Sequence, residues 1–323
     1  MKVAIAGAGT TGAYLYRLLI NEDFHADIFD KKRNTACGIT PCAWGTSIGF
    51  VEMVQAAGLD PEKYILQRVD HVIMDDVQLK GEVMTYDKPS LERDLLEGVT
   101  IKRGPLRVQA YDRVIDATGM HRAYLPPIET DILLPCAQRR VMTEAALEYR
   151  IKLGGLGYAW CFPLAKHGYH VGCGTLARNP NDALKEISWL TDNPKWKILC
   201  ACKGKVRLSG PHGSQPFVHD GTREGIWGVG ESIGCVAPLA GDGVVPGMKS
   251  VRILLDHWND PAGYTAAILK EFEWMKKQRE VVDKLQAASR LKLRDAWVLK
   301  KNATRMGIDV ELKDALVLLN AIR

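Results

Sequence analysis

Apolar runs that end in glycines open the chain. Residues 2–9 read KVAIAGAG, and residues 10–22 then place apolar side chains at helical spacing. A second short apolar run, HADIFD, occupies residues 25–30. A strand, a helix and a second strand in this order predict a βαβ unit.

Strand and helix signals alternate in the segment that follows. Residues 71–86 predict a hairpin, whose turn we expect near Lys80 and Gly81. Residues 90–98 predict a short helix, and residues 113–119, RVIDATG, predict another buried strand that ends in glycine. The short helix and the last strand extend the βαβ unit toward a larger nucleotide-binding domain.

Strand and turn signals dominate the middle of the chain. The stretch REGIWGVGE at 223–231 then predicts another buried strand, and residues 247–258 predict a helix. We therefore predict an α/β fold in which a β-rich substrate domain interrupts a Rossmann-like nucleotide-binding domain. The predicted boundaries are 1–125 and 221–261 for the nucleotide-binding domain, 126–220 for the inserted domain and 262–323 for a helical C-terminal segment. The hairpin near residues 70–86 is expected to join the inserted domain.

The composition is ordinary for a globular protein. Of the 323 residues, 46% are hydrophobic and 25% are charged. No apolar run reaches the ~18–20 residues that span a bilayer. The N-terminal segment lacks the apolar core and cleavage site of a secretory signal, so we expect a cytoplasmic protein.

Positive charge is concentrated in the last part of the chain. Residues 262–323 hold 13 lysines and arginines against 8 acidic residues, which accounts for the whole net charge of +5. The favoured interpretation is a solvated helix face. The second interpretation is a surface that meets anionic lipid headgroups, which would make the protein peripherally membrane-associated. Nucleic acid is the weakest of the three, so we expect no nucleic-acid partner.

The eight cysteines have no zinc-binding spacing, so we predict no metal site. They stand at positions 37, 42, 136, 161, 173, 200, 202 and 235. In a cytoplasmic chain of this size we expect most of them to be small buried hydrophobic residues.

A glycine motif follows the first predicted strand. Gly7, Gly9 and Gly12 form GxGxxG between a strand and a helix. The first glycine permits the tight turn, the second lets the backbone approach a pyrophosphate, and the third lets helix and strand pack closely. Asp30 ends the second strand, 23 residues after Gly7, where an acid accepts hydrogen bonds from the adenosine ribose. Together these features predict a dinucleotide site.

A second strand that ends in an acid favours FAD over a nicotinamide cofactor. The strand at residues 225–230 is followed by Glu231, and the turn PLAGDG and a helix come next. A nicotinamide enzyme needs no such strand, whereas an FAD enzyme can bind a ribityl hydroxyl through the acid. The helix N-terminus can place its positive dipole near the flavin N1–C2=O region. We therefore predict FAD as the cofactor.

Several stretches resemble known flavoproteins. Three stretches resemble the FAD-binding motifs of the p-hydroxybenzoate-hydroxylase-like flavoproteins: GxGxxG, VIDATG at 114–119 and GES…PLAGDG at 230–243. Within that group, PCAWG at 41–45 is similar to the CxxG segment of the geranylgeranyl reductase family, which includes archaeal digeranylgeranylglycerophospholipid reductases. A second stretch resembles the YxWxFP…GxG signature of that family. It consists of YAWCFP at 158–163 and, eight residues later, GCG at 172–174. The helical tail carries none of these motifs.

The resemblance implies an FAD site in the nucleotide-binding domain. By position, the implied contacts are Gly7, Gly9, Gly12, Asp30, Cys42, Ala43, Gly45, Lys88, Ala117, Gly119, Glu231, Gly241, Gly243 and Val244. Two of them depart from the family pattern. Glu231 stands where the family usually has aspartate, so its carboxylate lies ~1.5 Å further out. Lys88 stands where an arginine is usual, so the charge is kept and bidentate bonding is lost.

An aromatic stripe marks the predicted substrate side. Three large rings stand at alternate positions of the signature, so they share one face of a predicted strand. Two glycines share one parity on the next predicted strand, where missing side chains leave room. A flat aromatic floor beside a gap suits a long methyl-branched chain or one face of a flavin, and a plain core wall of rings is the alternative. The predicted substrate-binding residues are Tyr158, Trp160, Phe162, Gly172 and Gly174.

The reaction implied by the resemblance is hydrogenation of isolated C=C bonds in the geranylgeranyl-type chain of a prenyl lipid. Reduced FAD would deliver hydride to one alkene carbon, and a proton would reach the other. The reductant stays open between NAD(P)H, ferredoxin and a deazaflavin coenzyme. An FAD-dependent aromatic hydroxylase and a non-catalytic flavin- or lipid-binding protein are the alternative functions.

Cys42 is the favoured catalytic residue, through contact with the flavin or the alkene or through handling of a proton. A plain loop residue is the alternative, and Cys37 could pair with it as a redox dithiol. Residues 211–216 resemble a proline-bearing crossover between domains, which is either structural or part of the cavity wall. The weaker catalytic candidates are His121, His167 and His170, because a lone histidine is more often structural.

Overall fold

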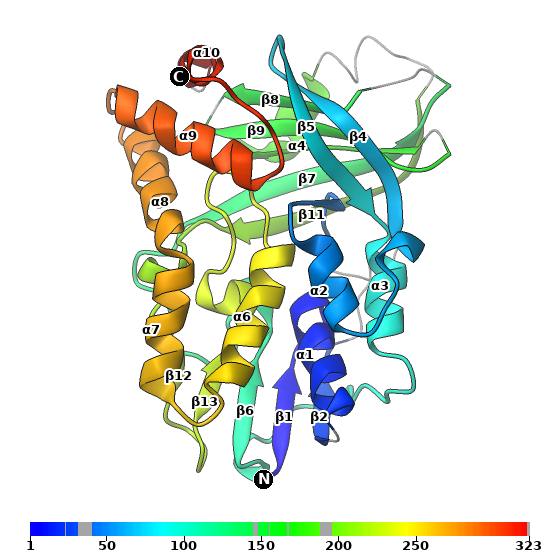
Figure 1. The fold of residues 1–323 in the computed structure, drawn as a ribbon, viewed down its shortest axis with the longest axis vertical. Coiled ribbons are helices and arrows are strands. Elements are labelled where there is room, and N and C mark those ends of the chain that lie inside the picture. The colour runs from blue at the N-terminus through cyan, green and yellow to red at the C-terminus, as the bar shows by residue number, and fades with distance from the viewer. Residues whose placement is uncertain are drawn as a thin grey trace.

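Two β-sheets of different size organise the chain (Figure 1). The computed structural model describes residues 1–22, 24–31, 41–144, 148–154, 156–166, 168–187 and 196–321. Within these residues the strands form a five-stranded sheet and an eight-stranded sheet. The smaller sheet stands at the lower end in Figure 1, and the larger one crosses the upper end.

The smaller sheet contains the predicted βαβ unit. Its order is β12-β13-β6-β1-β2, and its neighbours are parallel except for β12 and β13. Its strands are β1 (Val3–Ala6), β2 (Ala26–Phe29), β6 (Arg113–Asp116), β12 (Val218–His219) and β13 (Ile226–Gly228). The prediction is confirmed, because α1 (Thr10–Asn21) connects β1 to its parallel neighbour β2. All four residues of β1 are buried, as a parallel strand covered on both faces requires.

Helices pack against the smaller sheet and share its core. These are α1, α2 (Phe50–Ala56), α3 (Lys88–Leu95), α6 (Val244–Asp256) and α7 (Pro261–Glu271). Large side chains such as Tyr14, Phe50 and Trp227 are fully or almost fully buried in this core. The helix predicted to start at Gly247 is α6, and it starts at Val244. Pro246 does not prevent this earlier start, because it stands in the first turn of the helix, where a missing N–H is tolerated.

The larger sheet has the order β11-β7-β10-β9-β8-β4-β5-β3, and its neighbours are antiparallel except for β4 and β8. Its strands are β3 (Gly45–Thr46), β4 (Ile65–Met74), β5 (Val77–Tyr86), β7 (Leu133–Met142), β8 (Arg150–Gly154), β9 (Gly157–Pro163), β10 (Gly168–Thr175) and β11 (Lys197–Arg207). A short helix, α4 (Pro180–Lys185), packs against this sheet. Strands from two separate parts of the chain therefore make one sheet.

The predicted hairpin forms, but its turn was placed wrongly. The turn between β4 and β5 consists of Asp75 and Asp76, and Asp75 has φ +52°, which aspartate tolerates. Lys80 and Gly81 lie inside β5. A Cβ on Gly81 would stand 2.9 Å from the carbonyl oxygen of Gly307, so this glycine admits the C-terminal segment rather than a turn.

The predicted aromatic hairpin is confirmed as β9 and β10. The two strands pair antiparallel, with Trp160 opposite Gly172 and Tyr158 opposite Gly174. Period-two alternation then places the three rings of β9 on one face of the sheet. That face is covered by helices from the end of the chain.

The C-terminal helices pack on the larger sheet. They are α8 (Glu273–Gln286), α9 (Leu293–Arg305) and α10 (Leu312–Ala321). In Figure 1, α8 rises along one side of the molecule, and α9 and α10 lie over the upper end. Short 3₁₀ helices are η1 (Pro61–Lys63), η2 (Val108–Ala110), η3 (Gly119–His121), η4 (Pro211–Gly213) and η5 (Gly230–Ile233). In the described part of the chain, every helix is too short or too polar to cross a bilayer.

Candidate functional site

A cavity of about 690 Å³ extends from the first glycine turn to the C-terminal helices. Most of the predicted site residues line it: Gly7, Gly9, Asp30, Cys42, Ala43, Gly45, Lys88, Ala117, Gly119, Tyr158, Trp160, Phe162, Glu231, Gly241, Gly243 and Val244. Gly12, Gly172 and Gly174 are predicted site residues that lie behind its surface.

Close backbone approach builds the first glycine turn. Gly7 has φ +106°, a left-handed conformation that favours glycine. A Cβ on Gly12 would stand 1.9 Å from the Gly7 carbonyl oxygen and 3.1 Å from the Ala117 Cβ. Gly9 directly precedes α1 and has no side chain that could cap the N–H groups of the first turn. The N-terminus of α1 therefore offers N–H groups and a positive dipole at the cavity, as a diphosphate requires.

Asp30 directly follows β2 and lines the same end of the cavity. Its Oδ1 accepts the N–H of Lys31 at 2.8 Å. The Arg103 guanidinium donates to the carbonyl oxygens of Asp30 and Lys31 at 3.4 and 3.0 Å. These bonds hold the acid at the edge of the cavity where the sequence predicts a partner for a ribose.

Lys88 begins α3 and is 7% exposed. Its Nζ lies 3.8 Å from Oε1 of Glu92, one helical turn away. The same oxygen accepts the hydroxyl hydrogen of Thr10 at 2.8 Å. Because a buried charge needs a partner, this group of three side chains joins the start of α3 to the start of α1.

Glu231 follows β13 and lines the cavity. Its Oε1 accepts the backbone N–H of Arg207 at 2.8 Å. Burial raises the pKa of the Glu231 carboxyl, whereas the Arg207 N–H and the charges of Arg207 and Lys88 lower that pKa. An aspartate would be shorter by about 1.5 Å, so the glutamate is the residue that reaches β11.

Arg207 ends β11 and connects the two sheets, a role that no motif in the sequence predicts. The guanidinium donates to both carboxylate oxygens of Asp131 at 3.0–3.2 Å, and to the carbonyls of Met120 and Glu231 at 2.8 and 2.7 Å. Burial raises the pKa of Asp131, but bonds from Arg207 and Ser209 hold that pKa below its usual value. The buried cation thus fixes Glu231 relative to the larger sheet.

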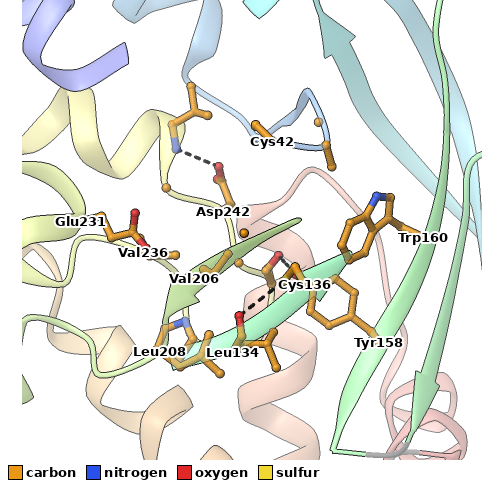
Figure 2. Close-up of a pocket in the computed structure, with 18 of the residues that line it drawn as sticks. Cys42, Leu134, Cys136, Tyr158, Trp160, Val206, Leu208, Glu231, Val236 and Asp242 are labelled. Atoms are coloured by element: carbon orange, nitrogen blue, oxygen red, sulfur yellow. Dashed lines mark hydrogen bonds between the residues drawn. The ribbon is translucent and has the colours of Figure 1, made fainter. Parts of the chain in front are cut away.

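The turn before α6 brings a carboxyl group to the cavity. Asp242 accepts the hydroxyl hydrogen of Ser47 at 2.6 Å and the N–H of Val244 at 3.2 Å. Burial raises the pKa of the Asp242 carboxyl, and these two hydrogen bonds lower it. Figure 2 shows Asp242 between Glu231 and the aromatic side chains.

Cys42 lies on a loop that faces the aromatic side chains (Figure 2). Its carbonyl accepts the Nε2–H of Gln138 at 3.1 Å, and the Oε1 of Gln138 accepts the Nε1–H of Trp160 at 3.1 Å. One glutamine on β7 therefore connects the two predicted residues. Nothing in the sequence singles out Gln138, because this chain of bonds joins three distant segments.

Tyr158, Trp160 and Phe162 form an aromatic wall, and the structure adds a fourth ring that the sequence does not predict. Tyr149 stacks on Phe162 with their centroids 4.2 Å apart, and both line the cavity. The hydroxyl of Tyr158 donates to the carbonyl of Ala240 at 2.7 Å. This bond ties the wall to the glycine-rich turn that precedes α6.

Gly172 and Gly174 do not leave the predicted room beside this wall. A Cβ on Gly172 would stand 2.4 Å from the indole of Trp160, so the ring itself fills the space. A Cβ on Gly174 would stand 2.8 Å from the Sγ of Cys136 and from the side chain of Leu134. Both glycines therefore permit close packing behind the wall, and the predicted gap beside the rings is absent.

His170 supports the Cys42 loop. Its Nδ1 lies 3.0 Å from the carbonyl oxygen of Ala43, so Nδ1 carries the proton and donates it. Burial lowers the pKa of His170 to about 4, and the ring meets Trp44 edge-on at 4.5 Å between centroids. The imidazole is therefore neutral near pH 7 and positions the loop.

The remaining candidates differ in their placement. His121, at the end of η3, lines the cavity. Residues 211–216 do not line it, and the Ser214 hydroxyl donates to the carbonyl of Gly210 at 2.7 Å, so this crossover is structural. Cys37 and His167 lie outside the described residues.

The far part of the cavity is an apolar chamber beneath the C-terminal helices, which the sequence did not predict. Aliphatic side chains from both sheet and helices line it: Met74, Val83, Ile151, Leu153, Val282, Leu285, Leu299, Ala303, Met306, Ile308, Val310 and Leu318. Gln286 and Asn302 are the amides among the described lining residues of α8 and α9. The tail is therefore part of the site.

Several solved structures share this fold. A geranylgeranyl bacteriochlorophyll reductase-like protein of Thermoplasma acidophilum aligns over 100% of this chain and 99% of its own, with 15% identity and a TM-score of 0.69. PqsL of Pseudomonas aeruginosa, a probable FAD-dependent monooxygenase, aligns over 93% and 99%, with 15% identity and a TM-score of 0.61. A tryptophan 6-halogenase of Streptomyces toxytricini aligns over 99% and 90%, with 14% identity and a TM-score of 0.65.

An uncharacterized protein of Methanocaldococcus jannaschii is 24% identical to this chain, over 90% of this chain and 92% of its own length. No protein-family model matches the sequence. The chain therefore has the fold of the FAD-dependent oxidoreductases, which confirms the predicted α/β class with its β-rich part and C-terminal helices.

Proposed function

We propose that this protein is an FAD-dependent reductase that hydrogenates isolated C=C bonds of a geranylgeranyl-type isoprenoid chain. The observation that carries the proposal is the continuity of one cavity, from the glycine turn at α1 to the chamber beneath α8, α9 and α10. Its polar end suits a dinucleotide, and its apolar end suits a long hydrocarbon. Cys42 and the aromatic wall lie where the two ends meet.

The residues at the polar end fit FAD. The uncapped N-terminus of α1 offers N–H groups to a diphosphate, and Asp30 accepts from the adenosine ribose. Glu231, held by the Arg207 N–H, stands ready to accept from a ribityl hydroxyl. The N-terminus of α6 directs its positive dipole at the same part of the cavity. When bound and reduced, FAD supplies the hydride for one alkene carbon.

The chamber fits an unactivated alkene. Such a bond has no carbonyl to polarise, so alignment and the exclusion of water must lower the barrier. Aliphatic side chains bind the chain with ~25 cal/mol for each Å² of apolar surface buried. Tyr149, Tyr158 and Phe162 present rings whose faces stabilise cationic character at a tertiary carbon.

Two alternatives share parts of this site. Monooxygenases and halogenases have the same fold, so the fold itself does not exclude oxygen chemistry. The chamber favours the reductase, because its aliphatic lining offers few hydrogen-bond partners to a phenol, and an unpaired buried hydroxyl is costly. A non-catalytic flavin- or lipid-binding protein would fill the same cavity but would show no turnover.

Anaerobic incubation tests the proposal. The purified protein is expected to be yellow with FAD. After reduction by dithionite it is expected to add one H₂ to each reduced double bond of geranylgeranyl lipids, as measured by mass spectrometry, and its flavin is expected to reoxidise faster when the lipid is present. A fully saturated lipid of the same length is the control, since it offers no alkene. Unchanged lipid mass and unaccelerated reoxidation would contradict the proposal, and oxygen uptake stimulated by a phenol would favour the hydroxylase.

We also propose that the outer faces of α9 and α10 contact anionic membranes. Leu293, Trp297 and Val317 are exposed by 57%, 45% and 55%. Two exposed cations lie on α9 beside these apolar side chains: Arg294 is next to Leu293, and Lys301 is one helical turn after Trp297. Apolar side chains accompanied by cations suit an anionic bilayer surface. The inner faces of the same helices line the chamber, so a lipid chain has a short path from the membrane to the site.

Replacing Trp297 with serine is expected to weaken binding to vesicles of anionic phospholipid by about tenfold, because the variant loses the apolar surface of the indole. Co-sedimentation with the vesicles measures this affinity. Ile198→Ser is the matched control, because Ile198 is 52% exposed but lies on β11. Equal vesicle binding by the wild type and both variants would contradict the membrane contact.

A further inference from the structure

A carboxyl group stands where the two ends of the cavity meet. Asp242 lies in the turn before α6, with Glu231 on one side and with Cys42, Trp160 and Tyr158 on the other (Figure 2). Its side chain borders the cavity, yet the residue is only 9% exposed. The proposed reduction needs a proton as well as a hydride.

Two donors hold this carboxyl group in place. The Ser47 hydroxyl lies 2.6 Å from Oδ2, and the N–H of Val244 lies 3.2 Å from Oδ1. Both bonds become stronger when the group is ionised, so they stabilise the carboxylate that remains after a proton leaves. The positive end of the α6 dipole acts in the same direction.

The surroundings favour the neutral carboxyl group before the proton is used. Burial raises the pKa of Asp242 above its usual value in spite of the two donors. Tyr86 and Tyr149 are buried and Tyr158 is partly buried, and all three lie within electrostatic range of Asp242. Desolvation raises the pKa of each phenol, so all three stay uncharged near pH 7. The site thus opposes loss of the proton to water while the hydrogen bonds prepare for its transfer.

The other acids at the cavity are less suited to donate a proton. Burial raises the pKa of the Cys136 thiol to about 12. Glu231 is held by the Arg207 N–H and lies across Asp242 from the aromatic wall. A carboxyl group is also the stronger acid by nature, with an ordinary pKa of about 3.9 for aspartic acid against about 8.5 for a cysteine thiol.

We propose that Asp242 is the proton donor of the alkene reduction, an inference that rests on the proposed function. Bound reduced FAD would supply the hydride for one C–H bond and would be oxidised in the same step. The π electron pair of the alkene forms the second C–H bond with the proton of Asp242, which leaves a carboxylate bonded to Ser47 and Val244. Water returns the proton before the next turnover, so the alkene gains one hydride and one proton.

Asp242→Asn tests the inference through the rate. In single-turnover reduction of a geranylgeranyl lipid by the pre-reduced holoenzyme, this variant is expected to be slower than the wild type by about 100-fold or more. Its FAD content is expected to be unchanged, and Asp242→Glu is expected to restore part of the rate. Asp75→Asn is the matched control, since burial also raises the pKa of Asp75, which lies at the β4–β5 turn outside the cavity lining.

A second measurement does not depend on turnover. An aza-isoprenoid that carries a protonated amine in place of one tertiary carbon mimics positive charge at the reacting position. The oxidised wild-type holoenzyme is expected to bind it about tenfold more tightly than Asp242→Asn does, because the ammonium group lowers the pKa of Asp242 and pairs with the resulting carboxylate, whereas the asparagine amide carries no charge. The neutral isoprenoid is expected to bind both proteins equally.

The outcomes separate this inference from the function on which it rests. An active wild type that Asp242→Asn matches in rate and in amine binding overturns the inference alone. A wild type that leaves every prenyl lipid unchanged overturns the proposed function and the inference with it. If the asparagine variant does not fold, Ser47→Ala, which removes one donor to the carboxylate, is expected to slow reduction by about tenfold. An unchanged rate in Ser47→Ala then overturns the inference.

Discussion

Replacement of Arg207 by alanine is expected to lower the free energy of unfolding by about 3–5 kcal/mol, the usual cost of breaking a buried ion pair. Arg207 is 3% exposed, and its guanidinium pairs with Asp131 and donates to three backbone carbonyls, those of Gly119, Met120 and Glu231. The alanine leaves the carboxylate of Asp131 without its cation and the carbonyls without these donors. The three carbonyls belong to the segments that follow β6 and β13 of the smaller sheet, whereas Asp131 precedes β7 of the larger sheet. We therefore expect the loss to affect the whole molecule.

Urea unfolding followed by circular dichroism measures this loss. Arg207→Lys is expected to fall between the wild type and the alanine variant, since lysine keeps the charge but cannot make the forked bonds. Arg223→Ala is the matched control, because its ion pairs with Asp112 and Glu224 are at the surface and contribute less than about 1 kcal/mol. If Arg207→Ala proved as stable as this control, the buried network would not be what joins the sheets.

Replacement of Gly12 by alanine is expected to weaken FAD binding by about 100-fold or more. The new Cβ would stand 1.9 Å from the carbonyl oxygen of Gly7, so the start of α1 must move away from β1 and β6. Relieving such a clash typically costs 1–3 kcal/mol or more, and about 1.4 kcal/mol corresponds to a tenfold change in affinity. The N–H groups at the start of α1 then no longer stand where a diphosphate needs them.

Titration of the flavin-free protein with FAD, followed by flavin fluorescence, measures the affinity. Gly104→Ala is the matched control, because a Cβ at this position meets nothing within 4 Å and its backbone does not need a positive φ. The control is expected to bind FAD as the wild type does. Equal affinity in Gly12→Ala would show that the turn is not the diphosphate site.

Local rules were enough for the elements that carry the nucleotide-binding motifs. The GxGxxG turn, its flanking strands and the acid at Asp30 all depend on backbone conformation and spacing within about 30 residues of sequence. The alternation of Tyr158, Trp160 and Phe162 likewise fixed which face of β9 carries the rings. For such features the residue type and the period of the element leave few alternatives.

The wrong predictions concern glycines whose neighbours come from distant segments. Gly81 was expected in a turn, but it allows the backbone at Gly307 to approach β5. Gly172 was expected to leave a gap, but the indole of Trp160 fills it. A glycine in a strand signals close approach without identifying the approaching group, so only the packed structure decides between a turn, a bulge and a contact.

The sequence by itself determined the βαβ unit, the glycine turn with its acid and the aromatic face of β9, because each rests on backbone geometry over a short span. Only the tertiary structure decided that Ser47 meets Asp242, that Gln138 connects Trp160 to the Cys42 loop, and that α8, α9 and α10 close an apolar chamber. These contacts join residues up to 195 positions apart, and a pattern along the chain records the burial of a side chain but not the partner that buries it.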